Sequence, residues 1–104
     1  MTERVLAGTF EELRATGYLL IGTRQLPIAV FLDEDEEPRA LDDRCPHLGS
    51  LLHLGEVRDG AVECHWHRAH FVLKTGCSLD PFADDVPTFP VEVEGESIFV
   101  VVGP

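Results

Sequence analysis

The sequence predicts an all-β fold of antiparallel strands, arranged as a barrel or sandwich. Its apolar runs are short, and glycine, aspartate and proline separate them at close spacing. No long amphipathic helix, internal repeat or low-complexity linker interrupts this pattern. The 104 residues suit one domain, 1–104, and a content of 44% hydrophobic and 26% charged residues is ordinary for a globular protein.

The first element expected is a short helical turn. Thr9-Phe10-Glu11-Glu12 has the spacing of a capping box, and Gly17 is a suitable stop. Two strands are then expected at residues 18–21 and 28–32, because both are apolar. Gly22, Gln25 and Pro27 lie between them and predict a tight connection.

Five successive acidic residues, 33–37, precede Pro38 and predict a solvated turn before a strand at 39–41. The remaining strands are expected where short apolar runs lie between turn residues, at 61–64, 71–73, 90–93 and 98–102.

The charge of the chain restricts its partners. Nineteen acidic against eight basic residues give a net charge of −11, which would repel nucleic acid and anionic membrane and would favour a basic protein surface. The first residues lack a signal-peptide pattern and no run is long enough to span a membrane, so we expect a cytoplasmic protein. Three cysteines, an odd number, argue against a disulfide framework and favour metal or redox chemistry.

The unusual chemistry lies in two segments, Cys45-Pro46-His47-Leu48-Gly49 and Cys64-His65-Trp66-His67. They form the pattern C-x-H-x16-C-x2-H, in which each segment supplies one thiol and one imidazole. Two cysteines and two histidines can hold tetrahedral zinc or a [2Fe-2S] cluster. Structural zinc sites usually take cysteines in one close pair and histidines in another, so the mixed segments favour the cluster.

These two segments resemble the cluster-binding boxes of the Rieske proteins. Phe71, Thr75-Gly76 and Pro81 also match the residues that follow the second box, and the resemblance covers roughly residues 5–102. It implies stacked antiparallel sheets, with a cluster-binding subdomain at approximately 43–80. It also implies a [2Fe-2S] cluster whose inner iron is bound by Cys45 and Cys64 and whose outer iron is bound by His47 and His67.

Four further positions indicate which Rieske class the chain resembles. High-potential respiratory members carry a disulfide between the boxes, whereas this chain has Ser50 and Trp66 at those places. Those members also donate hydrogen bonds from a serine and a tyrosine, where this chain has Ala69 and Phe71. The resemblance is therefore to the low-potential ferredoxins, which carry electrons from a flavin reductase to a terminal oxygenase.

The resemblance implies an electron carrier rather than a catalyst, because the chain is too short to include the mononuclear iron site of an oxygenase. We expect a monomer with redox protein partners. Two alternatives stay open: a small subunit of a larger oxidoreductase, like that of nitrite reductase, and a non-redox zinc-binding interaction domain.

The chain departs from the ferredoxin pattern at His65, where proline is usual, and at Arg68, where glycine is usual. Glycine at position 68 allows unusual backbone angles, so Arg68 calls the loop geometry into question. The positive charge of Arg68 should raise the reduction potential of the cluster. His53, His65 and His70 could form a second metal site or proton relay, but we interpret them as surface or hydrogen-bonded residues. Cys77 is expected to be semi-buried.

Overall fold

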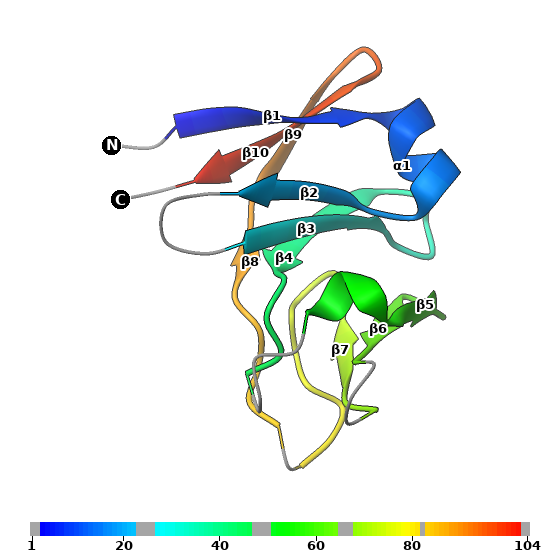
Figure 1. Ribbon diagram of the computed structural model, residues 1–104, viewed down its shortest axis with the longest axis vertical. Coiled ribbons are helices and arrows are strands. Elements are labelled where there is room, and N and C mark those ends of the chain that lie inside the picture. The colour runs from blue at the N-terminus through cyan, green and yellow to red at the C-terminus, as the bar shows by residue number, and fades with distance from the viewer. Residues whose placement is uncertain (1–2, 23–26, 47–50, 65–67, 82, 103–104) are drawn as a thin grey trace.

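Three antiparallel sheets are stacked along the long axis of the molecule (Figure 1). The computed structural model describes residues 3–22, 27–46, 51–64, 68–81 and 83–102. Within them the strand orders are β1-β10-β9, β2-β3-β4-β8 and β5-β6-β7. The elements are β1 (Glu3–Thr9), α1 (Phe10–Thr16), β2 (Leu19–Gly22), β3 (Pro27–Leu32), β4 (Pro38–Asp42), the 3-10 helix η1 (Leu52–Leu54), β5 (Glu56–Arg58), β6 (Ala61–Glu63), β7 (His70–Val72), β8 (Thr88–Phe89), β9 (Val91–Glu94) and β10 (Ser97–Val102). The predicted antiparallel all-β fold is confirmed.

Helix α1 begins and ends where the sequence predicts. The Glu12 N–H donates to Thr9 Oγ1 at 3.1 Å and the Thr9 N–H donates to Glu12 Oε1 at 3.0 Å, which completes the capping box. Gly17 adopts the left-handed conformation with φ 90° and donates its N–H to the Leu13 carbonyl. Among the described helices, none has the length and apolarity needed to cross a membrane.

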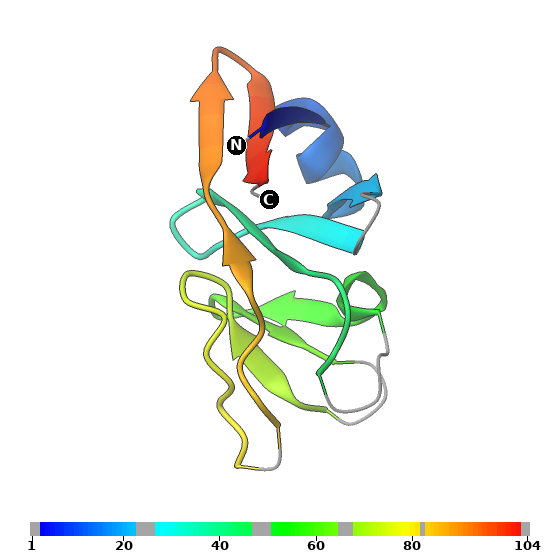
Figure 2. The same ribbon diagram turned by 90° about the vertical axis from the view of Figure 1, so that its left-hand side faces the viewer.

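The middle sheet is covered on both faces, as Figure 2 shows. Ile28 and Val30 of β3 belong to a core shared with Leu13 and with Ile98 of β10. Their neighbours Ala29 and Phe31 belong to a second core, shared with the β5-β6-β7 sheet. Successive side chains of a strand point to opposite faces, so a strand buried on both faces reads as a continuous apolar run. This position explains the sequence of β3.

The predicted strands agree with the structure within one or two residues, but the prediction missed β1, β5 and β8. The predicted connection between β2 and β3 falls on residues 23–26, which lie outside the described residues.

The acidic turn after β3 is exposed at residues 34–37, but Asp33 is buried, so the expectation of a wholly solvated turn is wrong. Asp33 accepts hydrogen bonds from the Asp35 and Glu37 N–H groups at 2.8 and 3.0 Å and from Arg39 Nε at 2.8 Å. Burial alone would raise the pKa of Asp33, but these hydrogen bonds outweigh it and lower the pKa below its ordinary value.

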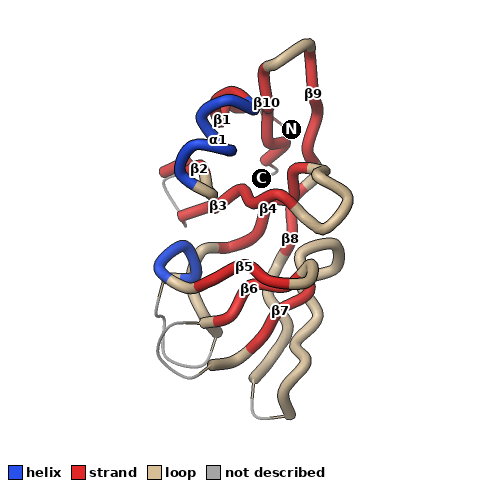
Figure 3. The backbone as a smooth tube through the Cα atoms, turned by 90° about the vertical axis from the view of Figure 1, so that its right-hand side faces the viewer, coloured by secondary structure: helices blue, strands red, loops and turns tan. Residues whose placement is uncertain are grey.

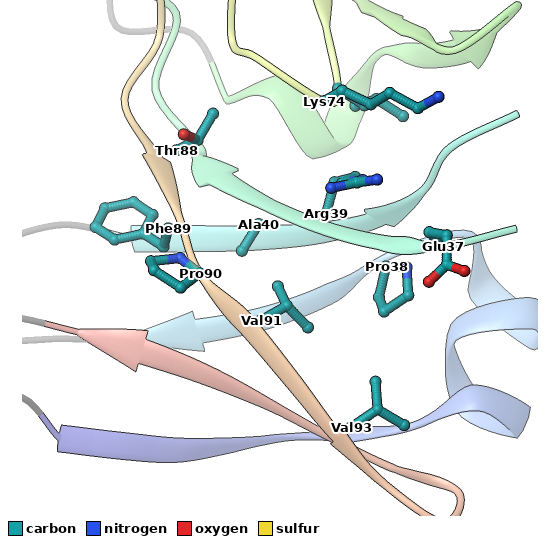
Figure 4. Close-up of a pocket in the computed structure, with 11 residues that line it drawn as sticks. Glu37, Pro38, Arg39, Ala40, Lys74, Thr88, Phe89, Pro90, Val91 and Val93 are labelled. Atoms are coloured by element: carbon teal, nitrogen blue, oxygen red, sulfur yellow. The ribbon is translucent and has the colours of Figure 1, made fainter. Parts of the chain in front are cut away.

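The same turn contacts the third sheet. Lys74, which follows β7, donates to Asp35 Oδ2 at 2.6 Å, and the carboxylate raises the pKa of the lysine. A groove of about 450 Å³ lies beside this contact, between Lys74 and strands β4, β8 and β9. Arg39 and Lys74 extend across one side of it, and Phe89, Pro90 and Val91 lie along the other (Figure 4). Its lining includes neither Cys45 nor Cys64.

Candidate metal centre

The two thiols predicted as ligands lie in one apolar core. Cys45 follows β4 and Cys64 follows β6. Both are fully buried in the hydrophobic core that also includes Leu52, Val62 and Phe71. The β5-β6-β7 sheet that carries Cys64 lies beneath the middle sheet, away from α1 (Figure 3). The two predicted imidazole ligands, His47 and His67, lie outside the described residues.

The first loop is closed across its base. The Leu52 N–H donates to the Asp43 carbonyl at 2.6 Å, and Arg44 and Leu51 form an antiparallel bridge. Arg44 also pairs with Asp42 at 3.2 Å, and this carboxylate raises the pKa of Arg44. A pocket of about 260 Å³ reaches Cys45 beside this pair, with Asp42, Arg44, Pro46 and Pro87 as the rest of its lining.

The second loop is closed by its own backbone. The Cys64 N–H donates to the Ala69 carbonyl at 2.7 Å, and the Arg68 N–H donates to the Cys64 carbonyl at 2.9 Å. Arg68 has φ 58°, in the left-handed region that glycine adopts most easily. The arginine thus keeps a backbone angle typical of glycine, at a cost of about 1 kcal/mol. Arginine in place of the usual glycine therefore does not change the backbone conformation expected at position 68.

The residues after the second box complete the site. Ala69 and Phe71 are fully buried, and neither side chain has a donor. Gly76, at φ 75°, donates its N–H to the Val72 carbonyl at 2.7 Å and accepts from the Val86 N–H at 2.8 Å. The first bond closes the turn after β7, and the second joins the returning chain, residues 83–88, to that turn.

The other histidines that the sequence drew attention to are bound to carboxylates. His53 contacts Asp43, and His70 contacts both Glu63 and Asp80. The described part of the chain contains no group of three or more histidine, cysteine or acidic residues that could hold a metal ion. The interpretation as hydrogen-bonded histidines is confirmed for His53 and His70, whereas His65 lies outside the described residues.

Two features differ from the sequence analysis or were missed by it. Cys77 is exposed, so the expectation of a semi-buried thiol is wrong. Asp43 was not considered, although its side chain is almost completely buried next to the first loop. No local pattern marks it, because its partner His53 lies ten residues later and contacts it only in the folded chain.

The donor set fits an iron–sulfur cluster. Two buried thiols from separate loops, enclosed by apolar side chains, are a suitable environment for a cluster that is bound by soft sulfur ligands and shielded from water. Cys45 and Cys64 have this environment.

Comparisons with known proteins agree with this chemistry. The family model "Rieske [2Fe-2S] domain" matches residues 4–90. The 3-phenylpropionate/cinnamic acid dioxygenase ferredoxin subunit of Shigella boydii serotype 4 is 41% identical over 76 residues, which are 71% of this chain and 72% of that protein. The subunit of the same name from Escherichia coli K12 has the same identity and coverage.

Two solved structures share the fold. One is the ferredoxin of carbazole 1,9a-dioxygenase from Nocardioides aromaticivorans IC177, with a TM-score of 0.82, 24% identity, and coverage of 93% of this chain and 95% of that one. The other is a putative NADH-dependent nitrite reductase small subunit from Mycobacterium tuberculosis, with a TM-score of 0.84, 21% identity, and coverage of 100% and 98%. At these identities the likeness concerns the fold alone. The family match and the 41% identity to a dioxygenase ferredoxin subunit show that the chain belongs to the Rieske [2Fe-2S] family and is an electron-transfer protein of the ferredoxin type.

Proposed function

We propose that this ferredoxin carries one electron at a time from a flavin reductase to a terminal ring-hydroxylating oxygenase. The observation that carries the proposal is the burial of Cys45 and Cys64 in one apolar core, at the bases of two separately closed loops. The relative that is 41% identical is named as a dioxygenase ferredoxin subunit, which supports this choice of partner.

The cluster-binding subdomain, approximately 43–80, would hold the [2Fe-2S] cluster through four side chains. Cys45 and Cys64 would bind the inner iron, and His47 and His67 would bind the outer iron. When bound, the cluster supplies a centre that accepts and releases one electron. Two ferric ions, two sulfides and two thiolates sum to zero charge, so accepting an electron is easier than for an all-cysteine cluster, which has a charge of −2.

The residues near the two boxes favour a low reduction potential within the Rieske range. Hydrogen bonds to the cluster sulfurs raise the potential, and the buried side chains of Ala69 and Phe71 offer none. Ser50 and Trp66 also leave the boxes without the bridging disulfide of the respiratory proteins. A low-potential carrier is suited to a reductase that takes its electrons from a nicotinamide cofactor.

We further propose a monomer in the cytoplasm that docks transiently on its partners, and the charge and the exposed groups support the docking. A net charge of −11 favours partners with a basic surface. Pro46, beside Cys45, is exposed and is available for contact with a partner, whereas Leu52 is fully buried and packs the core. The alternative of a fixed nitrite reductase-type subunit is less well supported, because the two boxes contain all four ligand residues.

The ligand assignment is tested by metal content, with matched control variants. Cys64→Ser should lose iron and acid-labile sulfide, while Cys77→Ser, at an exposed cysteine outside both boxes, should keep them. His67→Gln should lose the cluster, while His65→Gln, two residues away in the same box, should keep it. Equal iron in both members of either pair, or zinc in place of iron in the wild-type protein, would contradict the assignment.

The partner assignment is tested separately. With NADH and a flavin reductase from a ring-hydroxylating dioxygenase system, the visible absorption of the oxidised cluster should bleach. A cluster that dithionite reduces but the reductase does not would keep the redox assignment and exclude this class of partner. Elution from a size-exclusion column at the volume of an 11.5 kDa monomer would support transient docking.

A further inference from the structure

A buried carboxylate lies at the point where the chain leaves β4 for the first loop. The side chain of Asp43 is only 2% exposed, and its two oxygens have different partners. Oδ1 accepts from the backbone N–H of His53 at 2.7 Å, and Oδ2 lies 2.5 Å from Nδ1 of the His53 ring. One carboxylate therefore holds both the backbone and the ring of His53.

The backbone of Asp43 is also fixed on both sides. Its N–H donates to the Pro27 carbonyl at 2.9 Å, and its carbonyl accepts from the Leu52 N–H at 2.6 Å. The first loop, residues 44–51, connects Asp43 to Leu52 along the chain, and Cys45 is its second residue. Asp43 and His53 thus flank the two ends of the loop and are bonded to each other across its base.

The His53 ring also packs against an aromatic side chain. Its centroid lies 4.9 Å from that of the Tyr18 ring, at an angle of 46°, and its side chain is 12% exposed. The ring therefore contacts both the Asp43 carboxylate and the Tyr18 ring. It cannot turn away without losing both contacts.

The second loop has a histidine at a comparable place but is held differently. His70 Nε2 lies 2.9 Å from Glu63 Oε2, and its Nδ1 lies 3.3 Å from Asp80 Oδ2, but the His70 and Glu63 side chains are 40% and 37% exposed. Solvent-exposed pairs contribute little to stability. The backbone bonds between Cys64, Arg68 and Ala69 close this loop instead.

We propose that Asp43 and His53 are positioning residues for the first metal-binding loop, and that their contact fixes the Cys45 thiol relative to the Cys64 thiol. This role rests on the ligands in the proposed function. Neither residue is among the four proposed ligands of the cluster. The pair acts through the base of the loop, so its loss should loosen the cluster and alter its geometry.

The test compares two substitutions of His53 in the iron-loaded protein. His53→Asn keeps an N–H donor at the place of Nδ1, whereas His53→Leu removes it, and both lose the ring that packs on Tyr18. We expect His53→Leu to lose visible cluster absorption about tenfold faster than wild type at a fixed temperature. A tenfold change in rate corresponds to about 1.4 kcal/mol, which is close to the contribution of one hydrogen bond to a charged group. The visible circular dichroism and reduced-state EPR spectrum of His53→Leu should also change. His53→Asn should stay within about twofold of wild type.

Asp33→Asn is the matched control, because Asp33 is also a buried carboxylate that accepts two backbone N–H groups and one side-chain donor, but it lies in the turn before β4. It should lower the melting temperature without changing either spectrum. Asp43→Asn, which preserves volume, should accelerate cluster loss and provides the same test if His53→Leu does not fold.

The outcomes separate this inference from the proposed function. A wild-type protein that holds no iron would overturn the ligand assignment and with it the positioning role. An iron-loaded wild type whose rate and spectra are matched by His53→Leu, or by Asp43→Asn if His53→Leu does not fold, would overturn the positioning role alone. So would equal spectral changes in Asp33→Asn.

Discussion

Replacing Gly76 with alanine tests the turn that fastens the returning chain to β7. A Cβ at this position would lie 2.0 Å from the Val86 carbonyl oxygen and 2.9 Å from Thr88 Cγ2. The oxygen cannot withdraw easily, because the Val86 N–H is bonded to the Gly76 carbonyl at 2.8 Å. Overpacking costs about 1–3 kcal/mol, the weakened hydrogen bond about 1 kcal/mol, and a side chain at φ 75° about 1 kcal/mol more.

Gly95→Ala provides the control for this variant. Gly95 has φ 60°, but nothing lies within 4 Å of its added Cβ, so only the backbone cost of about 1 kcal/mol applies. Gly76→Ala should therefore destabilise the protein by about 2–4 kcal/mol more than Gly95→Ala.

The assay is thermal unfolding of the oxidised protein, followed by circular dichroism at one scan rate, because cluster loss makes unfolding irreversible. The difference corresponds to a melting temperature about 10 °C or more lower for Gly76→Ala than for Gly95→Ala. Equal melting temperatures for the two variants would refute the reasoning, because the two positions share a positive φ and differ in the close contact.

Three further predictions concern Arg68, Asp33 and Thr9. Arg68 is exposed and forms no ion pair within the described residues, so Arg68→Gly should lower the reduction potential by roughly tens of millivolts through loss of a nearby positive charge. Arg58→Ala, in β5, should leave it unchanged, and a redox titration in which Arg68→Gly has an unchanged or higher potential would contradict this. The lowered pKa of Asp33 stabilises the fold above the unfolded-state pKa of about 4, and this contribution is lost as pH falls through the folded-state pKa. The gap in melting temperature between wild type and Asp33→Asn should accordingly be full at neutral pH and narrow below about pH 4, and a gap that stays constant would argue against it. Thr9→Ala removes the helix cap and should cost about 1 kcal/mol in chemical denaturation, so a variant as stable as wild type would show that the cap contributes nothing.

The sequence predicts those elements whose signals are local. The capping box at Thr9 and the apolar run of β3 each lie within a few residues, and both elements form where expected. Strand β1 was missed because its residues are mixed in character and its partner β10 is at the other end of the chain. Strand β5 was missed because all three of its residues are exposed, so no apolar pattern marks it.

The site shows the same division between local and long-range information. The spacing of Cys45, His47, Cys64 and His67 is a local signal, and it identified the family that the comparisons show. The burial of Asp33 and the contact between Asp43 and His53 depend on which segments meet after folding. A run of acidic residues is the same in sequence whether or not an arginine returns to pair with one of them, so these features required the structure.

The most direct test of the central claim is the EPR spectrum of the dithionite-reduced wild-type protein, with iron and acid-labile sulfide measured on the same sample. We expect a signal whose average g value lies below that of a free electron, from a cluster in which two imidazoles replace two thiolates on one iron. A reduced protein without this signal, or a sample that contains zinc and no sulfide, would contradict a Rieske cluster held by the two boxes.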